Sequence, residues 1–217
     1  MKKGVIFDMD GTLFDTERLY AVTWGVTAEH MGYEPHPDFP RAVAGSSGEG
    51  QREIIRRFYP GVDAQAFQDY CYARIAELVA GGPPDKPGVR EILAFFRERG
   101  VKIAVASSSG HEVIETDIRN AGIESFFDAV VSGEDVEHGK PAPDIFLLAA
   151  KLLGCAPEDC YVFEDSLNGV RAGIAAGCAT IMIPDMVPPA EDFRESCAGI
   201  YPSFFEAIDA LKAESDA

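Results

Sequence analysis

Apolar runs that end in acidic residues are the most informative pattern along this chain. Val5, Ile6 and Phe7 form a short apolar run, typical of a strand buried on both faces of a parallel sheet. Asp8 and Asp10 follow directly. Because residues two apart in an extended backbone point to the same side, we expect both carboxylates to converge just beyond the strand. Open α/β sheets bind their ligands at this edge, so the pattern predicts a site there rather than a solvated loop.

From residue 87 onward, predicted helices alternate with predicted strands. The expected strands cover residues 101–106, 129–131, 161–163 and 179–183, and the helices between them show apolar residues at helical spacing. The helix after the fourth strand carries a face of glycine and alanine, including Gly169 and Gly173, which would let its backbone approach the sheet closely. This alternation predicts an α/β fold, with a parallel sheet and helices on both of its faces.

Residues 15–80 break the alternation. They contain helical patterns over residues 16–31, 49–59 and 63–80, followed by a linker at 81–84 that is rich in glycine and proline. A helical insert directly after the first strand is placed to act as a lid over the sheet edge. We therefore predict a core domain formed by residues 1–14 and 87–217, and a helical cap with its linkers over residues 15–86.

Composition and charge limit the classes of partner. The 217 residues include 19 Lys and Arg against 36 Asp and Glu, a formal charge of −17, which argues against nucleic acid or an anionic membrane as partner. Any site for an anionic substrate must be locally positive. No apolar run reaches the about 20 residues of a membrane span. The five cysteines are odd in number and show no C-x-x-C spacing, so we expect reduced thiols in a cytoplasmic protein. We also expect a monomer.

Three further motifs end at the same expected edge. The second strand runs into Ser107 and Ser108, whose hydroxyls and neighbouring amides could cradle a phosphate, although serine-rich turns are common. Lys140 follows the third strand, in a loop stiffened by flanking prolines, where a solvated surface lysine is the alternative. The fourth strand ends in Glu164 and Asp165.

Together these motifs predict a metal and phosphate site. Asp8, Asp10, Glu164 and Asp165 would lie close together, and such like charges destabilise a fold unless something neutralises them. Oxygen ligands favour a hard divalent cation, and Mg²⁺ is the usual ion where phosphate shares the site. Lys140 and the serine turn would supply the groups that bind the phosphate.

In their order and spacing, these motifs closely resemble those of the haloacid dehalogenase superfamily. The motifs span almost the whole chain: they are the segment from Asp8 to Asp15, Ser107, Lys140 and the pair that begins at Glu164. The helical insert is similar to that of the subfamily that holds sugar-phosphate phosphatases and β-phosphoglucomutases. The resemblance implies a Rossmann-like core with sheet order 3-2-1-4-5 and a mobile helical cap.

The resemblance also implies catalytic roles for two residues. Asp8 would attack phosphorus and form an aspartyl-phosphate. Asp10 would protonate the leaving oxygen and then deprotonate the water that cleaves the intermediate. The dehalogenases of the superfamily lack this second aspartate, so Asp10 favours phosphoryl transfer over cleavage of a carbon–halogen bond.

Ligand-binding roles follow from the same resemblance. Asp8, the main-chain oxygen of Asp10 and Asp165 would hold Mg²⁺, with Glu164 either a further ligand or a neighbour of the ligands. Ser107 and Lys140, together with Ser108 in the same turn, would bind the transferred phosphoryl group and stabilise its charge.

The predicted function is hydrolysis of a small phosphomonoester, most simply a phosphorylated sugar. The alternative is an isomerase of the β-phosphoglucomutase kind, but such mutases usually have histidine where Tyr20 stands and a basic residue where Gly48 stands. A third alternative, a non-catalytic protein on the same fold, would be expected to lack Asp8 or Asp10.

Overall fold

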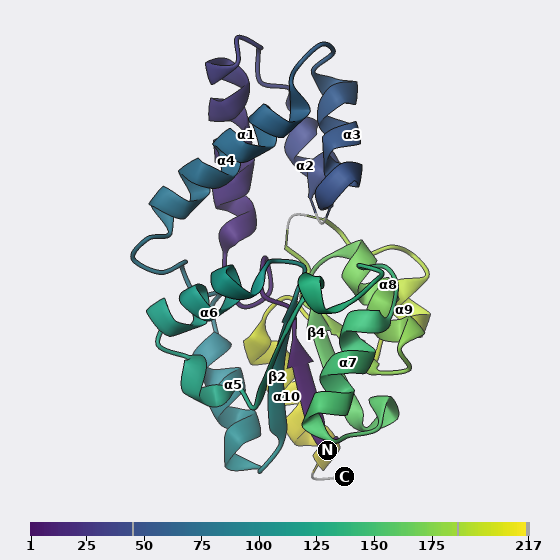
Figure 1. The fold of residues 1–217 in the computed structure, drawn as a ribbon. Helices are drawn as coiled ribbons and strands as arrows, with labels where there is room; N and C mark the ends of the chain where they lie inside the picture. The colour runs from purple at the N-terminus through teal and green to yellow at the C-terminus, as the bar shows by residue number, and fades with distance from the viewer. Residues whose placement is uncertain (45, 186, 216–217) are drawn as a thin grey trace.

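A parallel β-sheet forms the centre of the protein. The computed structural model describes residues 1–44, 46–185 and 187–215, and within these ranges six strands lie in the order β3-β2-β1-β4-β5-β6, each parallel to its neighbours (Figure 1). The predicted order 3-2-1-4-5 is confirmed, and β6 extends the sheet at one edge. The strands are β1 (Gly4–Phe7), β2 (Lys102–Ser107), β3 (Ala129–Ser132), β4 (Cys160–Glu164), β5 (Ala179–Met182) and β6 (Gly199–Ile200).

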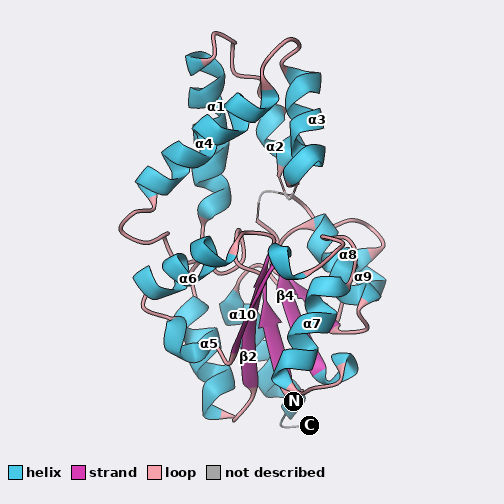
Figure 2. Ribbon diagram, viewed as in Figure 1, coloured by secondary structure: helices cyan, strands magenta, loops and turns pink. Residues whose placement is uncertain are grey.

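Helices cover both faces of the sheet (Figure 2). Because side chains alternate along a strand, Val5 and Phe7 pack with α5 and α10 on one face, whereas Ile6 packs with α7 and α8 on the other. The core helices are α5 (Val89–Glu98), α6 (His111–Asn120), α7 (Asp144–Leu153), α8 (Leu167–Ala175), α9 (Phe193–Ser196) and α10 (Phe204–Ser215). Short 3₁₀ helices lie at η1 (Glu124–Phe126), η2 (Gly133–Asp135) and η3 (Pro157–Asp159).

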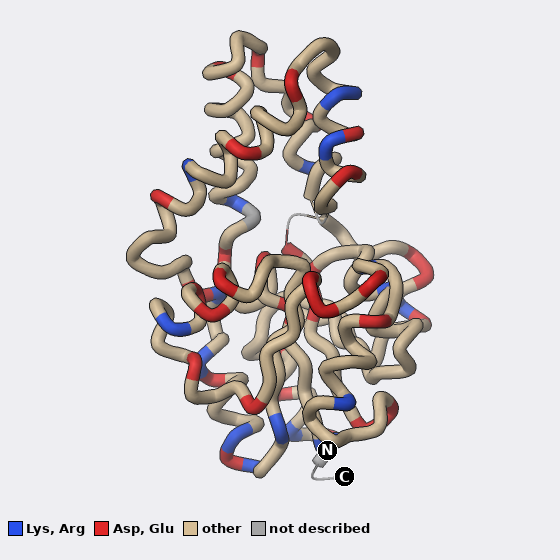
Figure 3. The backbone as a smooth tube through the Cα atoms, viewed as in Figure 1, with Lys and Arg blue, Asp and Glu red and all other residues tan. Residues whose placement is uncertain are grey.

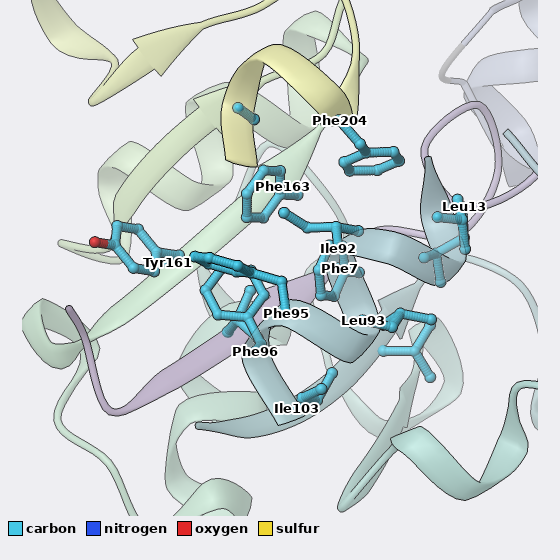
Figure 4. Close-up of a cluster of buried hydrophobic side chains, with 14 of the residues drawn as sticks. Phe7, Leu13, Ile92, Leu93, Phe95, Phe96, Ile103, Tyr161, Phe163 and Phe204 are labelled. Carbon is cyan, nitrogen blue, oxygen red and sulfur yellow. The ribbon is translucent and has the colours of Figure 1, made fainter. Parts of the chain in front are cut away.

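An aromatic cluster fixes the two central strands beside one another (Figure 4). The rings of Phe7 and Phe163 stack with their centroids 5.0 Å apart, and Phe96 and Phe204 contact both rings. All four side chains are buried. This packing holds the carboxyl ends of β1 and β4, where the acidic residues follow, at a fixed separation.

Helix α8 packs closely on the sheet, as its glycines predict. A Cβ atom at Gly173 would lie 2.5 Å from Thr180 Oγ1 and 3.1 Å from Val162 Cγ1. A side chain at this position would therefore push α8 away from β4 and β5.

A helical region follows β1 and lies over the carboxyl edge of the sheet (Figure 1). It consists of α1 (Thr16–His30), α2 (Phe39–Val43), α3 (Gly48–Phe58) and α4 (Ala64–Leu78), and has its own apolar core. The ring of Trp24 stacks on Phe67 at 5.9 Å and meets Phe39 edge-on at 5.7 Å. The predicted helical insert is thus present, and the predicted ranges of its three helices end within two residues of α1, α3 and α4.

The two linkers to the helical region are paired with each other. The amide of Asp15 donates to the Pro84 carbonyl at 2.8 Å, and that of Lys86 donates to the Leu13 carbonyl at 2.9 Å. The Lys86 ammonium also lies 2.7 Å from Asp185 and 3.5 Å from Asp15. The two chain connections between the helical region and the core therefore run side by side as a hydrogen-bonded pair.

Some elements were not predicted from the sequence. These are the short helices α2 and α9, the two-residue strand β6, and the C-terminal helix α10. Gly45, within the predicted cap, lies outside the described residues. Among those described, no helix combines the length and apolar character needed to cross a membrane.

Candidate active site

A tight turn after β1 places the first two acidic residues. The amide of Asp8 still pairs with the Phe163 carbonyl at 3.0 Å, so its side chain leaves from a fixed point of the sheet. Gly11 then adopts φ +83°, and a Cβ atom there would overlap the carboxylate of Asp165. Glycine is thus required both by its backbone conformation and by the close approach of Asp165.

Three buried carboxylates gather at this edge. Oxygen atoms of Asp8, Glu164 and Asp165 all lie within 4.8 Å of one another, and Thr12 Oγ1 donates to Asp165 at 3.0 Å. Glu164 comes from the end of β4 and is only 1% exposed. The set could hold a metal ion, because clustered carboxylate oxygens suit a hard divalent cation.

Lys140 is the cation that balances this cluster. Its ammonium, whose side chain is 7% exposed, contacts Asp8 Oδ1 and lies 2.7 Å from Glu164 Oε1 and 3.3 Å from the Ala106 carbonyl. Three carboxylates and one ammonium leave two formal negative charges, which a divalent cation would neutralise. The donor set and its charge therefore fit a hard divalent cation.

Burial and charge shift the pKa values of this group. Burial raises the pKa of Asp8 to about 8, opposed by the positive charge of Lys140 and reinforced by the negative charge of Glu164. For Lys140, burial acts to lower the pKa, but Asp8 and Glu164 outweigh it and hold the pKa above its usual range. Lys140 therefore stays charged, whereas Asp8 depends on nearby positive charge to ionise.

Asp10 has different surroundings from Asp8. It accepts hydrogen bonds from Thr16 Oγ1 at 2.9 Å, Ser109 Oγ at 3.1 Å and Ser107 Oγ at 3.5 Å. Burial raises its pKa, and the bonds from Thr16 and Ser109 oppose that shift. Its side chain is not among the three carboxylates that could hold a metal, so it is available to carry a proton.

The serine turn lies at the end of β2, and Ser109 in this turn makes a contact that the sequence did not predict. Ser107 is buried at the end of β2 and accepts a hydrogen bond from the Ser109 amide at 3.1 Å. Ser108 is exposed to the cavity described below, whereas Ser109, for which no role was predicted, holds Asp10. The signal for Ser109 was its place in the same serine run.

A cavity of about 760 Å³ lies between the helical region and the sheet edge, with Asp8, Asp10 and Lys140 at its base. The helical region contributes Tyr20, Trp24, Gln51, Gln68 and Tyr72 to its walls. Tyr72 donates to Gln51 Oε1 at 2.7 Å, and Arg52 donates to Gln68 Oε1 at 3.1 Å.

Sequence reasoning missed the polar wall formed by Gln51, Gln68 and Tyr72. The signal was present, since Gln51 lies four residues before the buried Ile55, and Gln68 lies seven before the buried Ile75. A polar residue in the buried stripe of a helix indicates a partner or a site.

The fold and the clustered acids agree with comparisons to known proteins. The sequence profile described as haloacid dehalogenase-like hydrolase matches residues 2–177. The chain belongs to this family. It is 34% identical over 180 residues to a phosphorylated carbohydrates phosphatase from Thermotoga maritima, covering 82% of this chain and 83% of that protein. It is 32% identical over 175 residues to a fructose-1-phosphate phosphatase from Escherichia coli, covering 80% and 92%.

A solved structure with bound phosphate is also similar. The structure of CbbY from Rhodobacter sphaeroides in complex with phosphate has a TM-score of 0.78 and 29% identity, and the match covers 95% of this chain and 96% of that one. With these relatives, the chain is an enzyme of the haloacid dehalogenase phosphatase type.

Proposed function

We propose that this enzyme is a Mg²⁺-dependent phosphatase that hydrolyses a small phosphorylated sugar through an aspartyl-phosphate on Asp8. The two curated relatives support the substrate class, because both act on phosphorylated carbohydrates. The cavity supports it as well, since its volume suits a small molecule and its far wall carries carboxamide and hydroxyl groups.

The contrast between Asp8 and Asp10 carries this proposal. Asp8 contacts the Lys140 ammonium and lies beside two further carboxylates, which suits an ionised nucleophile. Asp10 is held by hydroxyl groups and its side chain lies outside the carboxylate cluster, which suits a proton carrier. Burial raises the pKa of both carboxyls, so the contrast between them lies in their partners, and the ionised form of Asp8 depends on the positive charge beside it. Two carboxylates whose surroundings differ in this way can divide nucleophilic and acid–base roles between them.

The metal would be held by Asp8, Asp165 and the main-chain oxygen of Asp10. Glu164 would be either a further ligand or a neighbour of the ligands. When bound, Mg²⁺ would supply positive charge that favours the ionised form of Asp8 and draws the phosphate oxygens into the site. Ser107, Ser108 and Lys140 would bind the same phosphoryl group from the core side.

The reaction then proceeds in two displacements at phosphorus. A carboxylate oxygen of Asp8 forms a bond to phosphorus as the sugar oxygen leaves, and Asp10 gives its proton to that oxygen. Asp10 next removes a proton from water, whose oxygen attacks phosphorus and releases inorganic phosphate from Asp8. Lys140 stabilises the charge of the phosphoryl group throughout.

The scarcity of positive charge in the described cavity lining supports hydrolysis over mutase chemistry. Among the described residues that line it, Lys140 is the only lysine or arginine, and it is already paired with Asp8 and Glu164. A mutase must hold a second phosphate. Arg52 lies behind the far wall, bonded to Gln68 at 3.1 Å, but it is outside the described lining and is already paired with Glu49 at 2.8 Å.

The test uses p-nitrophenyl phosphate, whose leaving group needs little help from an acid. Asp10→Asn should release about one nitrophenol per enzyme in a burst and then stall, whereas Asp8→Asn should show no burst and lose at least a thousandfold in kcat. A steady rate for Asp8→Asn within tenfold of the wild type would refute the proposal. Formation of glucose 6-phosphate from β-glucose 1-phosphate faster than phosphate release would instead support the mutase.

A further inference from the structure

Asp117 is a buried acid in the cavity wall to which the reaction gives no role. It lies in α6 on the core side and is 6% exposed. Among residues 1–44, 46–185 and 187–215, none makes a hydrogen bond or an ion pair with its carboxylate. Its carboxylate is not among the fully buried oxygens that lack a partner, because the side chain lines the cavity. Partial burial still disfavours its charged form, so the fold alone does not account for an acid at this position.

The pattern of α6 makes Asp117 more unusual. Its buried face consists of Ile114, Asp117 and Ile118, which are spaced as one apolar stripe. An apolar side chain at position 117 would continue that stripe. Burial raises the pKa of Asp117 to about 6, and the negative charge of Asp10, which lines the same cavity, adds to the shift.

The remaining charges in the cavity indicate what Asp117 can bind. Glu112 adds a further acid to the core side, and Figure 3 shows acidic positions along the loops that face the helical region. The opposite wall, formed by Gln51, Gln68 and Tyr72, is uncharged. Away from Lys140, the described lining of the cavity therefore offers hydrogen-bonding groups and negative charge, but no lysine or arginine that could pair with a second anion.

We propose that Asp117 is a specificity-determining residue that accepts hydrogen bonds from hydroxyl groups of the leaving group and excludes leaving groups with a second negative charge. This inference rests on the proposed phosphatase function and narrows its substrates to neutral, polyhydroxylated phosphomonoesters. Substrate hydroxyls would give the Asp117 carboxylate the partners that the protein itself does not supply.

The experiment compares two substrates that differ at one carbon. Sorbitol 6-phosphate ends in a hydroxymethyl group and 6-phosphogluconate in a carboxylate; p-nitrophenyl phosphate is the reference that has no hydroxyl groups. Values of kcat/KM are measured for the wild type, Asp117→Asn and Asp117→Leu. Glu115→Gln is the matched control, because Glu115 is an exposed acid on the same helix outside the cavity lining.

The two variants separate charge from hydrogen bonding. Asp117→Asn keeps an acceptor but loses the charge, so the preference for sorbitol 6-phosphate over 6-phosphogluconate should fall about tenfold. Asp117→Leu loses both, so kcat/KM for sorbitol 6-phosphate relative to p-nitrophenyl phosphate should fall about tenfold or more. Both ratios should stay within about twofold in Glu115→Gln, whose charge is exposed to solvent.

Two results would overturn the inference while leaving the phosphatase intact. One is a wild type that hydrolyses 6-phosphogluconate as well as sorbitol 6-phosphate, and the other is a pair of Asp117 variants with unchanged ratios. A wild type that releases phosphate from none of the three compounds would overturn the proposed function and this inference together.

Discussion

Gly169 is the position where a single added methyl group should disturb the candidate site most. It is the third residue of α8, and a Cβ atom there would overlap Oε1 and Cδ of Glu164. Because Glu164 is buried at the end of β4, its carboxylate can make room only by giving up its present contacts. Gly169→Ala should therefore reduce both the free energy of unfolding and the phosphatase activity.

The magnitude follows from the contacts of that carboxylate. Glu164 accepts hydrogen bonds from Lys140 Nζ at 2.7 Å, the Ser166 amide at 2.8 Å and Ser166 Oγ at 3.0 Å. A hydrogen bond to a charged group contributes about 1.5–3 kcal/mol, so losing two of them removes about 3–6 kcal/mol. The better helix propensity of alanine returns about 1 kcal/mol, leaving a net loss of about 2–5 kcal/mol.

The assay is urea denaturation followed by circular dichroism, with phosphate release measured on the same preparations. Gly50→Ala is the matched control, because Gly50 is also the third residue of its helix, α3, and has no atom within 4 Å of the added Cβ. That variant should be as stable as the wild type or more stable by up to about 1 kcal/mol. A Gly169→Ala enzyme with the stability and turnover of the wild type would refute the close approach of α8 to Glu164.

Three further outcomes are expected. Chelation should abolish phosphate release and Mg²⁺ should restore it, whereas Asp165→Ala should need at least about tenfold more Mg²⁺ for half-maximal activity; full activity in excess chelator would contradict the metal assignment. Asp117→Asn should be more stable than the wild type above pH 6, by about 1–2 kcal/mol once solvent screening in the cavity is allowed for, and this advantage should shrink as the pH falls to 4. The reason is that folding raises the pKa of Asp117 from 3.8 to about 6, so the folded wild type loses stability as the pH rises through that range. An equal difference in melting temperature between variant and wild type at pH 4.5 and at pH 7.5 would rule this out. Lys140→Met should lower the free energy of unfolding by about 3–5 kcal/mol in denaturation curves, because Asp8 and Glu164 would lose their buried counter-charge, and an unchanged midpoint would contradict that pairing.

The sheet and the acidic edge could be predicted because both follow from local pattern. A run such as Val5 to Phe7 has to be buried on both faces, and parallel strands bring their carboxyl ends to one edge, so Asp8 and Glu164 had to meet. Strand β6 has only two residues, Gly199 and Ile200, too few to show any periodicity. Helix α10 does have a pattern, since Phe204, Ile208 and Leu211 share one buried face, and the sequence would have sufficed to find it.

The cavity wall could not be predicted, because it depends on where the helical region lies. Gln68 and Tyr72 become neighbours of the site only when α4 is placed over the sheet edge, and no local pattern fixes that placement. The surroundings of Asp117 could not be predicted for the same reason. Its position in an apolar stripe is visible in the sequence, but whether it faces a partner or a cavity depends on the packing of distant segments.

The paired linkers determine how the helical region can be displaced. Asp15 with Pro84 and Leu13 with Lys86 form a two-stranded ribbon, so the helices above it cannot slide along the sheet edge without breaking both hydrogen bonds. Thr16, the first residue of α1 beyond the ribbon, donates to Asp10 at 2.9 Å, so the ribbon also anchors the base of α1 at the candidate site. Gln51, in α3 on the far wall of the cavity, is separated from the ribbon by two helices of the chain, and among the hydrogen bonds of the described residues no such anchor ties it to the core side.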